Sequence, residues 1–136
     1  MRDLLRASVV CLPIVLLATA SVFAQAATLS ASDFYMQYRK AFDAAKKIED
    51  VMPFMSAETT KQIQATPPAD RGQMFEMIKM MGALTNVKIS KETRTASGAT
   101  LTVTALDPDK KNTTGTIDIV KENNAWKIGK ESWLTQ

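Results

Sequence analysis

The chain has 136 residues, with 17 lysines and arginines, 14 aspartates and glutamates, no histidine, and a net charge of +3. Because histidine is lacking and Cys11 is the only cysteine, Ser-His and Cys-His nucleophile pairs and the usual zinc sites are excluded. Basic and acidic residues are interspersed rather than gathered into a stripe, so nothing indicates nucleic-acid binding.

The first 26 residues have the features of an export signal. Two arginines precede an apolar run over 9–20, and Ala24-Gln25-Ala26 fits the small-x-small rule for cleavage. The apolar run is short for a membrane span of about 20 residues. We therefore expect a signal peptide over 1–26 that is cleaved after Ala26, and one mature domain over 27–136. The domain would then be periplasmic or secreted, without a membrane anchor and without cysteine.

The first half of the mature chain predicts helices. Ser30 can cap the first one, with Asp33 three residues on. The apolar residues that follow recur at helical spacing and predict an amphipathic helix of roughly four turns. They are Phe34, Tyr38, Ala41, Phe42, Ala45 and Ile48.

Two further helices are predicted before the strands. Pro53 fits only the first turn of a helix, and Ser56 then caps a short helix that runs to about Gln64. The Thr66-Pro67-Pro68 sequence interrupts the chain. A third helix begins at Pro68 or Ala69 and ends near Gly82.

From Asn86 to Leu134 the sequence predicts a meander of four antiparallel strands. Alternation of apolar and polar residues indicates strands with one buried face. Turn signals separate them at Ala96-Ser97-Gly98, at Asp107-Pro108-Asp109 and at Asn123-Asn124.

The last strand carries Trp126 and Ile128 on its core face. Gly129 then marks a β-bulge that returns Trp133 to that face. Helices that are segregated from strands predict an α+β fold. We expect the N-terminal helices to pack on a curved four-stranded antiparallel sheet that wraps around the first helix.

Three stretches carry a resemblance to a known family. They are Phe34 to Phe42, the Val51-Met52-Pro53-Phe54-Met55-Ser56 segment, and the strand, polar turn and Trp-Lys-Ile ending over 117–128. The chain resembles the nuclear transport factor 2-like superfamily, and within it exported bacterial domains of the lumazine-binding-like group. The resemblance implies a cone-shaped, cystatin-like α+β fold with a pocket between helix and sheet. Because that superfamily holds both enzymes and non-catalytic members, it implies no single activity.

We expect this domain to bind a small apolar ligand or a protein partner in or near the helix-sheet cavity, without catalysis. No cofactor and no metal is expected. Methionines such as Met74, Met77 and Met80 suit Cu(I) in principle, but their spacing favours core packing. The candidate cavity wall comprises Tyr38, Phe42, Phe54, Met55, Phe75, Ile78, Met81, Val103 and Trp126.

Two alternatives stay open. An isomerase- or lyase-like enzyme would need a tyrosine and an inward-facing carboxylate with a raised pKa. Tyr35 and Tyr38 lie in the right helix to donate, but Asp118 alternates toward solvent and Asp43 lies one residue off the apolar stripe. The other alternative is a structural module that forms a homodimer through the outer face of the sheet.

Overall fold

The computed structural model describes residues 29–136. The predicted signal peptide and its cleavage site lie outside the described residues. Helical elements precede all the strands, which confirms the predicted α+β class. In chain order the elements are α1 (Ala31–Ala44), η1 (Ile48–Asp50), η2 (Met52–Phe54), α2 (Ala57–Ala65), α3 (Pro68–Met81), β1 (Thr85–Arg94), β2 (Gly98–Leu106), β3 (Asn112–Glu122) and β4 (Ala125–Thr135).

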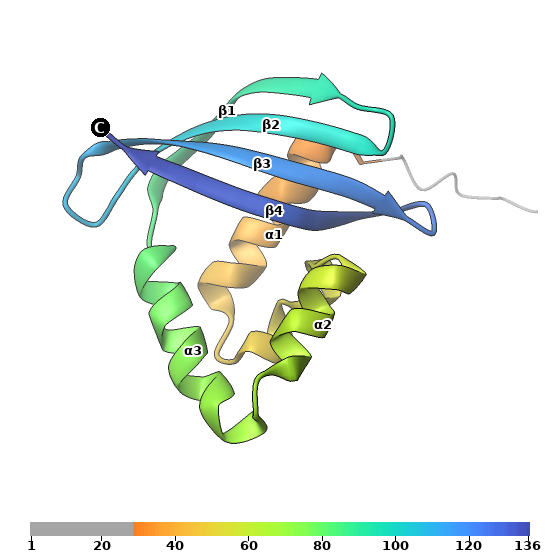
Figure 1. Ribbon diagram of the computed structural model, residues 1–136. Helices are drawn as coiled ribbons and strands as arrows, with labels where there is room; N and C mark the ends of the chain where they lie inside the picture. Colours follow the sequence, from red (N-terminus) through yellow and green to blue (C-terminus); the bar gives the residue numbers. More distant parts are fainter. Residues whose placement is uncertain (1–28) are drawn as a thin grey trace, which may run out of the picture.

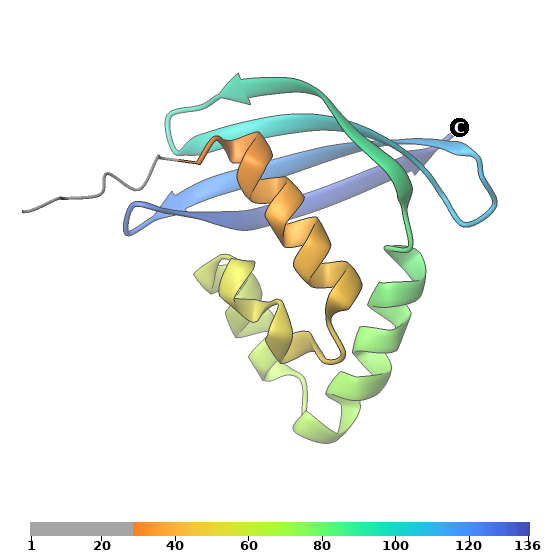
Figure 2. The same ribbon diagram turned by 180° about the vertical axis from the view of Figure 1, so that it is seen from behind.

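The four strands form one antiparallel sheet in the order β1-β2-β3-β4, as predicted. Figure 1 shows the sheet above the helices, with α1 lying against its underside and α2 and α3 farther from it. The opposite view shows α1 crossing beneath the strands (Figure 2). We call the side of the sheet toward α1 the inner face.

The inner face supplies much of the core. Leu101 and Val103 of β2 and Ile117 of β3 are fully buried, and their neighbours Thr102 and Thr116 point the other way. Burying one such aliphatic side chain stabilises the fold by about 1.5–3 kcal/mol. Among residues 29–136, no helix is long and apolar enough to cross a bilayer.

The predicted helix starts are confirmed by their caps. Ser30 Oγ accepts the Asp33 amide at 3.0 Å, and Ser56 Oγ accepts the Thr59 amide at 3.2 Å. The first helix is shorter than its apolar pattern, because it ends at Ala44 and Ile48 falls in η1. Ile48 is nevertheless buried, so the apolar pattern correctly predicted a buried residue beyond the end of the helix.

The predicted bulge at Gly129 is confirmed. Ile119 pairs with Ile128 and Asp118 pairs with Lys130, so Gly129 is the extra residue of β4. The bulge exchanges the faces of the residues that follow it. Trp133 accordingly lies on the inner face over Gly115, where a Cβ atom would come within 2.6 Å of the indole.

Candidate functional site

An apolar cavity of about 200 Å³ lies between the helices and β4. The first helix, the segment after it, α2 and α3 form its wall opposite the strand. The cavity is lined by Tyr38, Phe42, Ile48, Val51, Met55, Thr59, Ile63, Ile78, Ile128, Gly129, Lys130 and Glu131. We call it the main cavity.

A side cavity of about 180 Å³ lies next to it, between α1, the end of α3 and β4. It is lined by Arg39, Phe42, Ile78, Met81, Gly82, Glu131 and Trp133. Three residues therefore line both cavities: Phe42, Ile78 and Glu131. The only carboxylate among them is Glu131, so its carboxyl group faces a largely apolar environment from β4.

Glu131 is on the inner face because of the bulge at Gly129. It pairs with Ile117, whose side chain is fully buried. The Tyr38 hydroxyl donates to Glu131 Oε2 at 3.3 Å, and Oε1 is buried without a hydrogen-bond partner among residues 29–136. Burial raises the pKa of Glu131, and the charge of Arg39 and the two nearby tyrosine hydroxyls offset only part of that rise.

Three residues of α1 surround this carboxyl group. Tyr35, Tyr38 and Arg39 are spaced i, i+3 and i+4, which places them on one face of the helix. The Tyr35 hydroxyl is close enough to influence Glu131, but it makes no hydrogen bond of good geometry with any residue that the structure describes. Burial, and then the negative charge of Glu131, raise the pKa of both tyrosines, so both are protonated at neutral pH.

Arg39 is a buried cation, with 4 % of its surface exposed. Its Nη2 donates to the Gly82 carbonyl at 2.9 Å and lies 3.5 Å from a carboxylate oxygen of Asp43. Its guanidinium carbon is 4.9 Å from the centre of the Phe42 ring. The Arg39 Nε, however, is buried and has no hydrogen-bond partner in the described part of the chain.

Three buried side-chain atoms that have no hydrogen-bond partner within residues 29–136 define what this site can do. Tyr35 Oη and Arg39 Nε carry protons to donate, whereas Glu131 Oε1 accepts when ionised and can donate when protonated. Buried polar atoms are nearly always hydrogen-bonded to protein or water. Glu131 and Arg39 line the cavities whereas Tyr35 lines neither, so the polar end offers the free hydrogen-bonding capacity of Glu131 Oε1 and Arg39 Nε beside an apolar wall.

The predicted wall residues are divided between this site and the rest of the fold. Tyr38, Phe42, Met55 and Ile78 line the main cavity, and Met81 lines the side cavity with Phe42 and Ile78. The other four line neither cavity. Phe54 packs on the Phe34 and Tyr38 rings, and Phe75 lies edge-on to Phe42. Val103 is buried in the core of the sheet, and Trp126 lies at the start of β4, where it lines a different hollow.

The carboxylates considered from the sequence lie elsewhere. Asp118 is exposed and accepts the Thr100 hydroxyl, and Asp43 is exposed beside Arg39. Sequence reasoning missed Glu131 and Arg39. A signal for each was present, because Glu131 stands two residues before Trp133 and so shares its face. Likewise, Arg39 lies four residues after Tyr35 and one after Tyr38.

Within residues 29–136, no three histidine, cysteine, aspartate or glutamate side chains gather as a metal site would require. Comparison of the chain with protein-family models, with characterised proteins and with solved structures finds no match. Any functional assignment therefore depends on the geometry of this fold.

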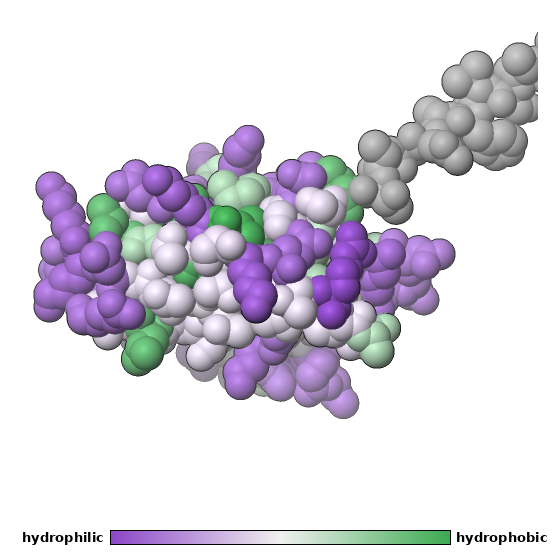
Figure 3. Space-filling view, turned by 90° about the horizontal axis from the view of Figure 1, so that it is seen from above, coloured by the Kyte–Doolittle hydropathy of each residue, from purple (hydrophilic) through white to green (hydrophobic). Residues whose placement is uncertain are grey.

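The outer face of the sheet is largely polar. It carries a row of threonines on the two central strands, Thr100, Thr102, Thr104, Thr114 and Thr116. Figure 3 shows a pale centre with strongly hydrophilic side chains at both ends of this face. A homodimer through this face stays a prediction.

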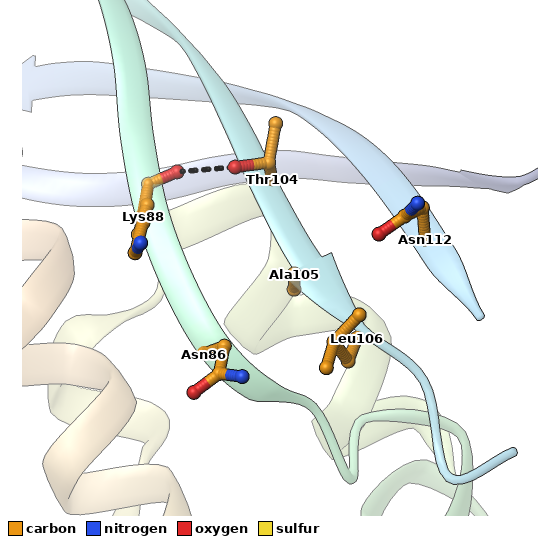
Figure 4. Close-up of a pocket in the computed structure, with 6 residues that line it drawn as sticks. All are labelled: Asn86, Lys88, Thr104, Ala105, Leu106 and Asn112. Atoms are coloured by element: carbon orange, nitrogen blue, oxygen red, sulfur yellow. Dashed lines mark hydrogen bonds between the residues drawn. The ribbon is translucent and has the colours of Figure 1, made fainter. Parts of the chain in front are cut away.

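A shallow hollow of about 190 Å³ lies where β1, β2 and β3 meet the loop before β3. It is lined by Asn86, Lys88, Thr104, Ala105, Leu106 and Asn112 (Figure 4). The Thr104 hydroxyl donates to the Lys88 carbonyl across it at 3.5 Å, a weak hydrogen bond. Its polar groups come from exposed side chains, so water competes for their hydrogen bonds. It is therefore a weaker candidate for a binding site than the buried cluster around Glu131.

Proposed function

We propose that this protein binds a small, mainly apolar molecule in the main and side cavities, with a neutral oxygen of the ligand beside Glu131, and without catalysis. The observation that carries the proposal is a buried carboxyl group facing an apolar wall, with unpaired donors next to it. Each cavity is smaller than the roughly 300 Å³ typical of drug-sized sites. The ligand is therefore small.

The polar end favours a neutral oxygen over a charged one. Because the pKa of Glu131 is raised, its neutral form persists to higher pH than that of an exposed glutamate and can donate a hydrogen bond. Tyr38 lines the main cavity, and its hydroxyl is a second donor. A ketone or alcohol oxygen accepts both bonds, whereas a carboxylate would bring a negative charge into a largely apolar space.

Three naphthalenes with the same apolar body test this chemistry. We expect each to displace the neutral dye N-phenyl-1-naphthylamine from the protein, with 2-acetylnaphthalene binding about fivefold more tightly than 2-ethylnaphthalene, since one net hydrogen bond contributes about 1 kcal/mol. The charged 2-naphthoate should bind most weakly. Equal affinity for all three would remove the role of the polar end.

A filling substitution tests the location. Ile78 is half-buried and lines both cavities, so Ile78→Trp should abolish dye binding. Met77→Trp is the matched control, because Met77 is the preceding residue and is 55 % exposed. Undiminished binding in the folded Ile78→Trp protein would place the ligand elsewhere.

A proton-transfer enzyme of the isomerase or lyase type is the second candidate. One contact favours it: Tyr38 Oη and Glu131 Oε2 are 3.3 Å apart beside the main cavity, as an acid and a base acting on one ligand would be. Such an enzyme should speed the exchange of the acetyl hydrogens of 2-acetylnaphthalene in D₂O, and Glu131→Gln should remove the effect. A bound ketone that exchanges only at the buffer rate leaves the binding role alone.

The proposal includes export and a family. We place the domain in the periplasm or outside the cell, on the basis of the features of residues 1–26, and in the nuclear transport factor 2-like superfamily, on the basis of the sequence resemblance and its α+β element order. Amino-terminal sequencing of the protein from its native cell should find Ala27 first. Retention of residues 1–26 in the cytoplasm would refute the export part.

A further inference from the structure

A second hollow, of about 320 Å³, lies at the end of the sheet where the β1–β2 and β3–β4 turns meet. Its lining consists of Arg94, Thr95, Ala96, Ser97, Gly98, Lys121 and Trp126. The turn between β1 and β2 has only small side chains, which leaves the space open. Gly98 has no room for a larger one, since a Cβ atom there would lie 1.9 Å from the Ile119 carbonyl oxygen.

Two cations converge on one indole in this hollow. Lys121 Nζ is 4.7 Å and the Arg94 guanidinium carbon 5.6 Å from the centre of the Trp126 ring. Trp126 is held in place, because its Nε1–H donates to the Leu29 carbonyl at 2.7 Å. A cation over an indole at an exposed site gains about 0.5–1 kcal/mol, so the ring keeps both positive groups at the hollow.

The positive charge there is only partly compensated. Arg94 Nε is 3.5 Å from a carboxylate oxygen of Glu92, but that carboxylate also accepts the Ser32 amide and hydroxyl at the start of α1. Lys121 has no salt bridge within residues 29–136. Two like charges held side by side repel each other, and an anion between them would remove that repulsion.

We propose that this hollow binds a phosphate group between Arg94 and Lys121. A guanidinium offers a fork of N–H donors that matches phosphate oxygens, and a lysine adds a point charge. Thr95 and Ser97 line the same space, and their hydroxyls can supply further donors. The hollow is larger than a phosphate ion, so it has room for part of the molecule that carries the group.

Phenyl phosphate is the probe for a soluble phosphate ester. The chain has two tryptophans, so its NMR spectrum shows two indole N–H signals, and Trp133→Phe identifies which belongs to Trp126. We expect the Trp126 signal of the native chain to shift saturably with phenyl phosphate. Benzoate should bind at least tenfold more weakly, and higher salt should weaken the phosphate interaction.

Charge-removing variants decide the location. Lys121→Met and Arg94→Met keep an apolar stem over the indole, and each should weaken binding about tenfold, the effect of losing roughly 1.4 kcal/mol of charge-assisted hydrogen bonding. Lys61→Met, at an exposed position of α2, should leave binding unchanged. Equal loss in all three variants, or the same affinity for benzoate, would overturn the proposal.

Vesicles distinguish a lipid headgroup from a soluble ester. Cosedimentation with vesicles of anionic phospholipid compares the native chain with Lys121→Met. Residues 9–20 are apolar and can bind vesicles in both proteins, so only the difference in bound fraction between the two reports on the hollow. A difference on vesicles without any response to phenyl phosphate assigns the phosphate to a lipid. A response to phenyl phosphate alone assigns it to a soluble ester. No response in either experiment refutes the site.

Discussion

Glu131 is the residue on which the chemistry of the site depends. Its side chain comes from an otherwise ordinary edge strand, and it reaches a region where two tyrosines and one arginine are also buried. A carboxyl group in such surroundings is destabilising when ionised, because burial removes its hydration. A carboxyl group whose pKa is raised by burial beside a cavity is typical of functional positions.

The raised pKa of Glu131 predicts a pH dependence of stability. Below the ordinary glutamate value of 4.5, the group is protonated in both the folded and the unfolded chain, and its contribution to stability is complete. As the pH rises from 4.5 through the higher pKa of the folded state, the unfolded chain ionises first and that contribution is lost. Each unit of difference between the two pKa values corresponds to about 1.4 kcal/mol.

Glu131→Gln should remove this dependence. We expect the variant to gain on the native protein in free energy of unfolding as the pH rises from about 4 to about 8, as measured by urea denaturation at several pH values. Glu58→Gln, at an exposed position of α2, is the control and should track the native protein. A constant difference between Glu131→Gln and native protein across this range would contradict the assignment.

At the scale of elements, the hydrogen bonds between α1 and α3 come from the last turn of α3 and from Gly82 directly after it. Lys79 Nζ donates to the Phe42 and Asp43 carbonyls at 2.7 and 2.9 Å, and so adds hydrogen bonds to carbonyls in the last turn of α1. Beyond α3, the Gly82 carbonyl accepts from Arg39. The Phe42 ring lies against Gly82, so the glycine sets the position of a ring that lines both cavities.

The two glycines at α3 should respond oppositely to alanine. At Gly82 a Cβ atom would be 2.8 Å from Phe42 Cζ, and we expect Gly82→Ala to lower stability by about 1–3 kcal/mol through overpacking. Gly72 lies inside the helix, and a Cβ atom there would have nothing within 4 Å, so Gly72→Ala should raise stability by about 0.5–1 kcal/mol.

Thermal unfolding followed by circular dichroism measures both changes. The Gly82 substitution should also weaken dye binding, because the displaced Phe42 ring moves into the cavities. Stabilisation by Gly82→Ala would mean that Phe42 gives way at no cost.

At the scale of the whole molecule, the sheet and the outer helices differ in how they are held. The central strands β2 and β3 are paired on both sides and bury alternate residues, whereas α3 buries only Phe75. Three methionines of α3 are exposed by more than half. Elements with few buried contacts open locally without global unfolding.

Hydrogen exchange should report this difference. We expect the amides of α3 to exchange at least about a hundredfold faster than those of β2 and β3, because they open without unfolding the sheet. A ligand in the main cavity touches α2 and α3 as well as β4, so bound 2-acetylnaphthalene should slow exchange in α2 and α3. Equal protection of α3 and the central strands in the free protein would refute the local opening of α3.

Much of the fold could be predicted from local features of the sequence. Serine caps, proline and glycine breaks, and two kinds of apolar periodicity predict the helices and strands, because each depends on hydrogen bonds and torsions within a few residues. Even the bulge could be inferred from Gly129 and from the spacing of Trp133. The helix end at Ala44 was not predictable from its stripe, since Ile48 is buried by a different turn.

The candidate site was only partly predictable, for a physical reason. Periodicity distinguishes inward from outward positions and found Tyr38, Phe42 and Ile78, but an inward position is apolar in most folds. Whether Trp126 or Glu131 faces the cavity depends on which elements pack opposite the strand. The sequence by itself determined the elements and their buried faces. Only the tertiary structure decided that a glutamate, an arginine and two tyrosines from distant parts of the chain share one buried space.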